Sequence, residues 1–227
     1  MNMIPDAARE FKPADYKSAV KPVWCPGCGD HSVLVSFQRA FAELGLPPEQ
    51  IAIISGIGCS SRIPAYVNAY GFHGVHGRAL PVATGLKLAR PELEVVVVGG
   101  DGVSPFSPVA IALAAGANFV ARGFALDVKP LADILVAAMK HPGFSFVEVL
   151  SPCITFRPEE MDWKKAIKRN AIQTTSDRKA AMAAVIGADE LMSGIIFEGD
   201  RPAYGQAHVA PAGMAAIEGE FIVDPAA

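Results

Sequence analysis

Apolar residues follow two different periods along this chain, and the alternation between the two predicts helices and strands in turn. Over residues 31–44 apolar positions recur at helical spacing, which predicts an amphipathic helix with Asp30 as its N-cap and Gly45 as its stop. Residues 93–98 are instead a run of mostly β-branched side chains, which is typical of a strand buried on both faces of a parallel sheet.

The same criteria predict the remaining elements. Strands are expected at 51–54, 119–123, 144–150 and 194–197, and helices at 80–88, 108–115, 128–139 and 177–188. Strands that alternate with helices indicate an α/β fold with a doubly wound, mostly parallel sheet, in which ligands gather at the carboxyl ends of the strands. Residues 24–160 form this domain, after an N-terminal arm over 1–23. Residues 161–227, rich in Gly, Pro and Ala, are expected to be a C-terminal extension that gains order on a partner.

Composition narrows the class of protein. A chain of 227 residues suits one large α/β domain with an appendage. Its apolar runs are shorter than the roughly 20 residues of a membrane helix, and a net charge of −3 without a basic block argues against nucleic acid as a partner. No signal peptide is recognisable, so a cytoplasmic location is expected. Because 51% of residues are hydrophobic and only 19% charged, a permanent partner subunit is expected to cover part of the surface.

The four cysteines carry the clearest chemical signal. Cys25 and Cys28 form a close pair, whereas Cys59 and Cys153 each follow a predicted strand. Since the carboxyl ends of parallel strands meet at one edge of a sheet, all four thiols are expected to converge. Four thiolates are the ligand set of an iron–sulfur cube or a structural zinc.

Other roles for the cysteines are less consistent with the sequence. A dithiol redox pair opens a helix directly after a buried strand, but residues 14–23 are polar and contain no clear strand. A zinc ribbon usually has two close pairs, and disulfides are not expected without a signal peptide. An iron–sulfur cluster is therefore favoured, with ordinary buried thiols as the alternative.

Two further segments suggest an anion site. Gly99-Gly100-Asp101-Gly102 follows a buried strand, where glycines admit a phosphate and an aspartate can hold Mg²⁺; an ordinary Asx turn is the alternative. Between residues 71 and 78, His76 and Arg78 are candidate anion contacts. His73 lies in the same stretch, which the intervening glycines predict to be a loop, so a His73–His76 metal pair is disfavoured. His31 and His208 are assigned structural or exposed roles.

Taken together, these segments resemble a known family. The motif Trp24-Cys25-Pro26-Gly27-Cys28-Gly29 begins an ordered series that continues at residues 56–62, 71–85, 99–102, 105–109 with 119–124, and 151–153. The series resembles the β subunit of 2-oxoacid:ferredoxin oxidoreductases over residues 16–157, and more weakly over 177–204. The resemblance implies a thiamine-diphosphate-binding fold that also carries one [4Fe–4S] cluster.

The resemblance also assigns residue roles. It implies that Cys25, Cys28, Cys59 and Cys153 are the cluster ligands and that Asp101 binds Mg²⁺. The implied thiamine diphosphate contacts are Ile57, Gly58, Cys59, Ser60, His76, Gly77, Arg78, Gly100 and Gly102. The glutamate that activates the thiamine ring belongs to the α subunit in this family, so the catalytic group is expected on that partner and the active site at the interface.

The activity implied by the resemblance is oxidative decarboxylation of a 2-oxoacid with coenzyme A, which yields acyl-CoA, CO₂ and two electrons passed singly to ferredoxin. The amino-terminal segment favours 2-oxoglutarate, with pyruvate or a broad range of 2-oxoacids as the nearest alternative. Two other classes remain open, namely a non-catalytic iron–sulfur electron-transfer subunit and a zinc-stabilised scaffold.

The resemblance breaks at one position. In the family an intervening segment with an asparagine ligand for Mg²⁺ follows the Gly-Asp-Gly motif, whereas here Gly102 is followed directly by Val103. We therefore expect residues to be missing there, so that Gly102 and Val103 are not covalent neighbours and their Cα atoms lie well beyond ~3.8 Å, with no thiamine diphosphate bound. A true deletion would favour the electron-transfer subunit.

Overall fold

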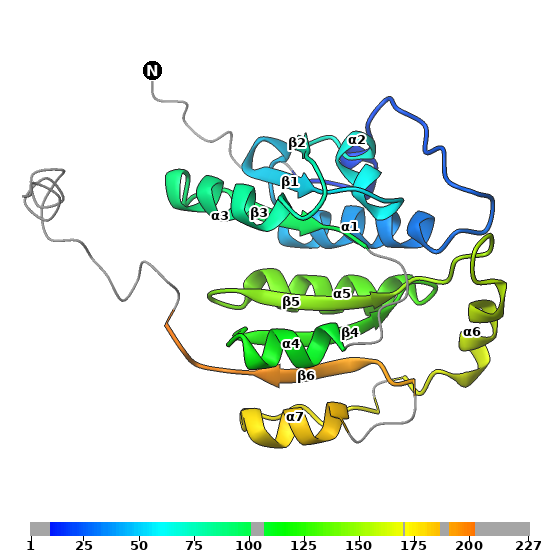
Figure 1. The fold of residues 1–227 in the computed structure, drawn as a ribbon. Helices are drawn as coiled ribbons and strands as arrows, with labels where there is room; N and C mark the ends of the chain where they lie inside the picture. Colours follow the sequence, from blue (N-terminus) through cyan, green and yellow to red (C-terminus); the bar gives the residue numbers. More distant parts are fainter. Residues whose placement is uncertain (1–9, 101–106, 170, 187–190, 203–227) are drawn as a thin grey trace, which may run out of the picture.

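The structure is a computed structural model that describes residues 10–100, 107–169, 171–186 and 191–202. Its strands form two three-stranded sheets (Figure 1). In the first, β1 (Ile51–Ser55) lies between β2 (Tyr70–His73) and β3 (Glu94–Val98) and is parallel to both. In the second, β4 (Phe119–Phe124) is parallel to β5 (Ser145–Leu150) and antiparallel to β6 (Gly194–Glu198). The prediction of a mostly parallel α/β fold is confirmed, although the described strands are divided between two sheets.

Helices cover both faces of the strands. The longest two, α1 (Asp30–Leu44) and α5 (Val128–Lys140), pack on each other and join the first sheet in one continuous core. The opposite faces are covered by α3 (Ala79–Ala89) on the first sheet, and by α4 (Pro108–Ala114) and α7 (Arg178–Ile186) on the second. This arrangement on both faces is the expected doubly wound one.

The ends of α1 correct one prediction and confirm another. Gly29, not Asp30, is the N-cap, and Asp30 lies inside the first turn with its carboxylate buried. The Oγ hydroxyl of Ser151 donates a hydrogen bond to this carboxylate at 2.9 Å, so the acid serves a contact between loops instead of capping the helix. Gly45 does end the helix, in the left-handed conformation (φ 63°) that lacks steric cost for glycine.

The predicted helices and strands are present with shifts of one or two residues at their ends. The sequence patterns missed β2 and the short helices α2 (Ile63–Tyr66) and α6 (Trp163–Ala166), together with 3₁₀ turns at Pro13–Tyr16, Pro48–Gln50, Ser60–Arg62 and Pro158–Asp162. The prediction that the strand at 93–98 is buried on both faces was also wrong. Only Val98 of β3 is buried, while residues 94–97 are half-buried. Within α3 only Ala83 is buried, so this helix covers the first sheet incompletely.

Both segments expected to flank the domain contribute to it. In the N-terminal segment Tyr16 is fully buried, with its hydroxyl 2.6 Å from the Leu46 carbonyl oxygen, and burial raises its pKa to about 12. Beyond residue 160, β6 completes the second sheet and α7 packs on α4. Within the described residues, no helix combines the length and apolar character needed to cross a bilayer.

Candidate functional site

The loops that carry the four cysteines meet at the carboxyl ends of the strands. Cys59 lies in the turn after β1, and its carbonyl oxygen accepts a hydrogen bond from the indole Nε1–H of Trp24 at 2.8 Å. Trp24 immediately precedes Cys25, so this bond ties the turn after β1 to the loop that holds the close cysteine pair. The loops that carry Cys25 and Cys59 are thereby joined by a direct hydrogen bond.

Cys153, in the loop after β5, is tied to the same pair. The backbone N–H of Gly29 donates to the Pro152 carbonyl oxygen at 3.2 Å. The hydroxyl of Thr155 lies 3.2 Å from the Sγ atom of Cys25 and donates to it. A side chain on Gly29 would collide with the Ser151 hydroxyl, since a Cβ there would lie only 2.5 Å from it, which explains the need for glycine at this position.

Electrostatics around these thiols disfavours their charged form in the absence of a cation. Burial raises the pKa of Cys28 to about 11, helped by the negative charges of Asp30, Cys59 and Cys153. Burial also raises the pKa of Cys59, with Asp30, Cys153 and Cys25 adding to the effect and Arg62 opposing it. Negative charge on Cys153 thus reaches both Cys28 and Cys59, and four thiolates at this position would need a positively charged body between them.

The donor set at these loops is four thiols. All four cysteines are free. Among the described residues, no three His, Cys, Asp or Glu side chains are grouped closely enough to hold a single metal ion. Four thiolates spread over three adjacent loops are the kind of donor set that a four-iron cube takes around its outside.

The predicted cofactor contacts lie at the same edge, on the first sheet. The turns after β1, β2 and β3 contain residues 57–60, 75–78 and 99–100, and these three strands are parallel neighbours. Gly58 has φ +114°, and a Cβ there would lie 3.0 Å from the Gly100 carbonyl oxygen. The two turns therefore lie against each other, with the Ser60 hydroxyl also close to Gly100, and glycine at both positions permits this close approach.

His73 is the residue whose position the sequence analysis misjudged. It ends β2 instead of lying in a loop, and its Nδ1 atom is 2.8 Å from the Ser61 carbonyl oxygen and 2.9 Å from the Ser55 hydroxyl. Because a carbonyl only accepts, Nδ1 carries the proton. Ser61 in turn donates from Oγ to the Ile57 carbonyl oxygen at 2.9 Å, so the His73 ring supports the whole 57–61 turn. The aromatic pattern of Tyr70 to His73 was the available signal for this strand.

The remaining predicted residues are divided between exposed and undescribed positions. Ile57, His76, Gly77 and Arg78 are exposed, and Arg78 is the N-cap of α3. Asp101, Gly102 and Val103 lie outside the described residues, as does His208. His31 packs edge-on against the Trp24 ring at 5.2 Å, a contact that supports the cysteine loop and involves no ligand.

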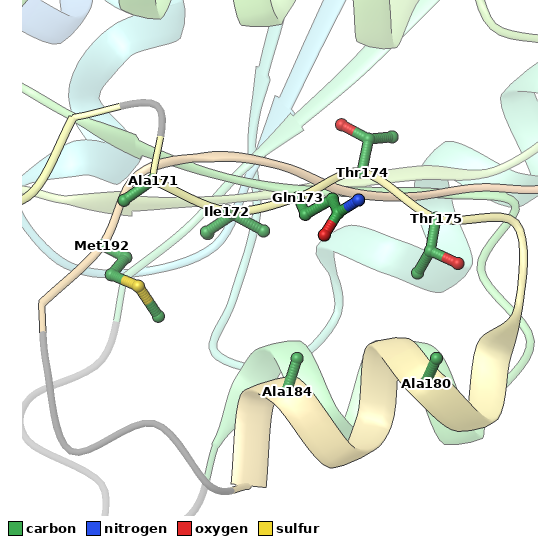
Figure 2. Close-up of a pocket in the computed structure, with 8 residues that line it drawn as sticks. All are labelled: Ala171, Ile172, Gln173, Thr174, Thr175, Ala180, Ala184 and Met192. Carbon is green, nitrogen blue, oxygen red and sulfur yellow. The ribbon is translucent and has the colours of Figure 1, made fainter.

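A pocket of about 400 Å³ lies elsewhere, between α7 and the segment that precedes it (Figure 2). Its lining carries no titratable side chain and consists of Ala171, Ile172, Gln173, Thr174, Thr175, Ala180, Ala184 and Met192. Because it lies on the second sheet, at neither the cysteines nor the glycine turns, we do not assign it to the chemistry of the strand ends.

Comparison with known proteins agrees with this geometry. The family described as the C-terminal TPP-binding domain of thiamine pyrophosphate enzymes matches residues 56–107, the segment that contains the turns after all three strands of the first sheet. The chain is 31% identical to the 2-oxoacid:ferredoxin oxidoreductase subunit beta of Saccharolobus solfataricus, in an alignment that covers 78% of this chain and 82% of the relative. This chain belongs to the family of 2-oxoacid:ferredoxin oxidoreductase β subunits.

Other members are similar to different extents. The 2-oxoglutarate synthase subunit KorB of Methanothermobacter marburgensis is 32% identical, with 79% of this chain and 84% of the relative covered. A solved 2-oxoglutarate:ferredoxin oxidoreductase from Magnetococcus marinus, with 2-oxoglutarate, coenzyme A and succinyl-CoA bound, aligns with a TM-score of 0.83 at 29% identity over 96% of this chain and 98% of that chain. This likeness confirms the fold.

One family member differs in length within the aligned range. Subunit beta of the Aeropyrum pernix 2-oxoacid:ferredoxin oxidoreductase 1 is 37% identical, and the chain spans only 62% of its length. That alignment runs over 198 residues, whereas the 63% of this chain that it covers is about 143 of 227 residues. The relative therefore has residues within the aligned range that have no counterpart here.

Proposed function

We propose that this chain is the β subunit of an enzyme that decarboxylates a 2-oxoacid, with 2-oxoglutarate as the first candidate, and transfers the acyl group to coenzyme A. The products are acyl-CoA and CO₂, and two electrons leave singly to ferredoxin. The observation that carries the proposal is the position of Cys59, a predicted cluster ligand that lies within the glycine turn predicted to bind the cofactor. One turn thus serves both sites, which gives electrons a short exit from the reacting centre.

In this proposal Cys25, Cys28, Cys59 and Cys153 hold a [4Fe–4S] cluster. A bound cluster accepts and releases single electrons. The chain contributes the four thiolates and the hydrogen bonds that hold their loops, including Trp24 to the Cys59 carbonyl and Thr155 to the Cys25 sulfur. The Thr155 hydroxyl, which donates to a ligand sulfur, would offset negative charge there and so favour the reduced state of a bound cluster, whereas Trp24 positions the Cys59 turn.

The glycine turns of the first sheet would hold thiamine diphosphate, with Asp101 as a ligand of Mg²⁺. The bound cofactor supplies a ring that stabilises a carbanion. The proposed contacts of this chain are Ile57, Gly58, Cys59, Ser60, His76, Gly77, Arg78, Gly100 and Gly102. The support is that the described turns are glycine-rich, largely exposed and lie at one edge of the sheet, and that Arg78 adds a fixed positive charge beside them.

The α subunit is the proposed permanent partner, and the exposed face of α3 and β2 is its proposed contact. Residues 57–60, 75–78 and 99–100 contain no Asp or Glu, and Asp101 is assigned to Mg²⁺, so the carboxylate that activates the thiamine ring is proposed to come from the α subunit. Exposed large apolar side chains lie on β2, in the turn after it and on α3, namely Tyr70, Phe72, Val75, Leu80, Val82 and Leu88. A surface of this kind is typical of an obligate interface.

The preference for 2-oxoglutarate draws on the names of relatives, which include 2-oxoglutarate synthase subunits and a structure with 2-oxoglutarate bound. Pyruvate remains the alternative substrate, and a cytoplasmic location is proposed. The test is an anaerobic panel of 2-oxoglutarate, pyruvate and 2-oxobutyrate with coenzyme A, on the chain co-expressed with its α subunit, followed by reduction of methyl viologen. We expect the highest kcat/KM for 2-oxoglutarate. Equal rates for all three acids would refute that preference, and no reduction with any of them would refute the activity.

A second candidate function rests on the residues that the relatives have and this chain lacks. We propose that they belong between Gly102 and Val103, where the family pattern is interrupted. If the native chain lacks them, the protein is an electron-transfer subunit without thiamine diphosphate. Mass spectrometry of the native protein decides between the two: a peptide that joins Gly102 directly to Val103 favours the electron-transfer subunit, and an intervening segment favours the enzyme.

A further inference from the structure

Phe156 is an aromatic side chain left in solvent directly beside a predicted cluster ligand. Its side chain is 81% exposed, although it lies only three residues after Cys153. Its backbone N–H donates to the Sγ atom of Cys153 at 3.4 Å. Ile154, on the other side of the same loop, is 40% exposed. A protein that covers the Phe156 ring would therefore lie next to the residue whose backbone N–H donates to the Cys153 sulfur.

Positive charge gathers next to this loop. Residues 163–169 contain Lys164, Lys165, Lys168 and Arg169 and no acid, in a chain whose net charge is −3. Arg169 is paired with Asp127 at 2.6 Å. The Lys165 Nζ atom lies 4.0 Å from the Asp162 carboxylate, at the distance limit of an ion pair, and both side chains are more than four-fifths exposed. Lys164 is exposed and makes no ion pair within the described part of the chain.

The acids near this loop are already engaged. Glu159 and Glu160 both pair with Arg157, and Glu160 also accepts a hydrogen bond from the backbone N–H of Cys153 at 3.2 Å. Asp127 pairs with Arg169 as described. Asp162 pairs with Lys165 only at 4.0 Å, with both side chains largely exposed to solvent, so the positive charge at this surface is that of Lys164, with Lys165 weakly compensated.

Two contacts hold this basic segment at the carboxyl edge of the second sheet. At its beginning, Glu160 fastens the 3₁₀ turn Pro158–Asp162 to the Cys153 loop. At its end, Arg169 is fastened to Asp127, which follows the carboxyl end of β4, and β4 pairs with β5 in parallel. Figure 1 shows α6 on the side of the molecule toward which β4 and β5 point.

We infer that Phe156, Ile154, Lys164 and Lys165 form the docking surface for a small acidic electron-carrier protein of the ferredoxin class. The inference rests on the proposed function, since it requires a cluster at Cys153. In the complex the carrier takes one electron from the reduced cluster, so the cluster is oxidised and the carrier reduced, with no bond or proton transferred. An apolar anchor bordered by cations suits a small, transient, electrostatically steered complex, whereas the larger apolar face of α3 suits the permanent partner.

The experiment uses the αβ complex and a purified acidic two-cluster ferredoxin in its oxidised form. Affinity is measured at low and high salt for Phe156→Ala and for the double variant Lys164→Glu/Lys165→Glu. Matched controls are Phe144→Ala, at the amino end of β5, and Lys140→Glu, at the far end of α5. Iron content, recovery of the αβ complex and 2-oxoacid-dependent reduction of methyl viologen are measured for every variant.

We expect Phe156→Ala to weaken ferredoxin binding about tenfold at either salt concentration, as for an interface anchor. The double variant should lose about tenfold in affinity at low salt and little at high salt. Both should retain iron, the αβ complex and viologen reduction, and the controls should match the wild type. Unchanged ferredoxin affinity in both variants overturns the docking surface, and loss of the α subunit from Phe156→Ala would assign the surface to that partner. Absence of viologen reduction in the wild type would refute the proposed function instead.

Discussion

The two candidate sites at the strand ends differ in how completely this chain builds them. The cysteine site has all four thiols on one chain, and hydrogen bonds between loops hold three segments far apart in sequence against one another. The cofactor site is open, because its described turns at residues 57–60, 75–78 and 99–100 and the adjoining helix α3 are largely exposed and contain no acid. Under the proposed function, the first would be a complete site and the second half of a shared one. An electron carrier would then be served by this chain alone, whereas the carbon chemistry would require the partner.

The largest effect is expected from removing one cluster ligand. Cys153→Ser should abolish the broad visible absorbance of the cluster and leave little iron, since the remaining three thiolates lie on loops held together partly through the Cys153 loop. Thermal stability should fall as well, because metal binding contributes to folding. Thr155→Val is the matched control: it removes only the hydrogen bond to the Cys25 sulfur and should retain most of the iron. A Cys153→Ser protein with full absorbance would show that the site is not complete as described.

A side chain on the glycine turn should separate the two sites. Gly58→Ala combines a left-handed backbone (φ +114°) with a Cβ 3.0 Å from the Gly100 carbonyl oxygen, so we expect loss of thiamine diphosphate binding by calorimetry in the αβ complex. Gly45→Ala is the control for backbone strain, because its φ is also positive (+63°) but nothing lies within 4 Å of the added Cβ. It should cost about 1 kcal/mol of stability and leave cofactor binding unchanged. Equal loss of binding in both variants would refute the contact between turns.

A smaller effect is expected at His73, which positions the turn without touching either ligand. His73→Asn keeps an N–H near the position of Nδ1, so it should preserve the bond to the Ser61 carbonyl. His73→Gln moves that N–H outward and should weaken thiamine diphosphate binding by about fivefold, equivalent to about 1 kcal/mol for a lost hydrogen bond. The iron content of both should be normal. If the Gln variant binds as tightly as the Asn variant, the ring does not position the turn.

The smallest effect concerns charge within the complete site. Asp30→Asn should lower the pKa of Cys28 from about 11 while leaving it above 9.0, because burial, the main cause of the increase, persists. The pH dependence of alkylation at Cys28 in the iron-free chain measures this. The raised folded pKa also means that the stability contributed by the protonated thiol is fully present below pH 9 and is lost as pH rises through about 11. An unchanged alkylation profile in Asp30→Asn would mean that the carboxylate does not act on this thiol.

The sequence predicted the elements with strong periodicity and missed those that depend on their neighbours. The helix over 31–44 and the strand at 51–54 follow from apolar spacing alone. β2 was missed because its four residues, all exposed, gain their structure from pairing with β1. The same pairing decides the position of His73, which local pattern assigned to a loop. Asp30 was misassigned for a related reason, since the Ser151 hydroxyl that draws its carboxylate inward is distant in sequence.

The candidate site could likewise be predicted where local motifs define it, and not where distant neighbours do. The order of motifs was sufficient to nominate the cysteines and glycine turns, and the parallel order of β2, β1 and β3 explains why those turns are adjacent. The incomplete cover of β3 could not be predicted, because a run of valines looks the same whether the chain itself or a partner buries it. Only the structure, in which α3 is exposed, shows that the chain itself does not bury this run completely.

The shared turn at residues 57–61 has a thermodynamic consequence. Iron bound at Cys59 and an anion bound at Gly58 and Ser60 would restrict the same short stretch of backbone, so whichever arrives first removes conformational entropy that the second no longer has to lose. Such coupling is reciprocal: the factor by which iron loading tightens cofactor binding must equal the factor by which the cofactor tightens iron binding. Assembly of this subunit would then favour the doubly loaded and the empty chain over either half-loaded form.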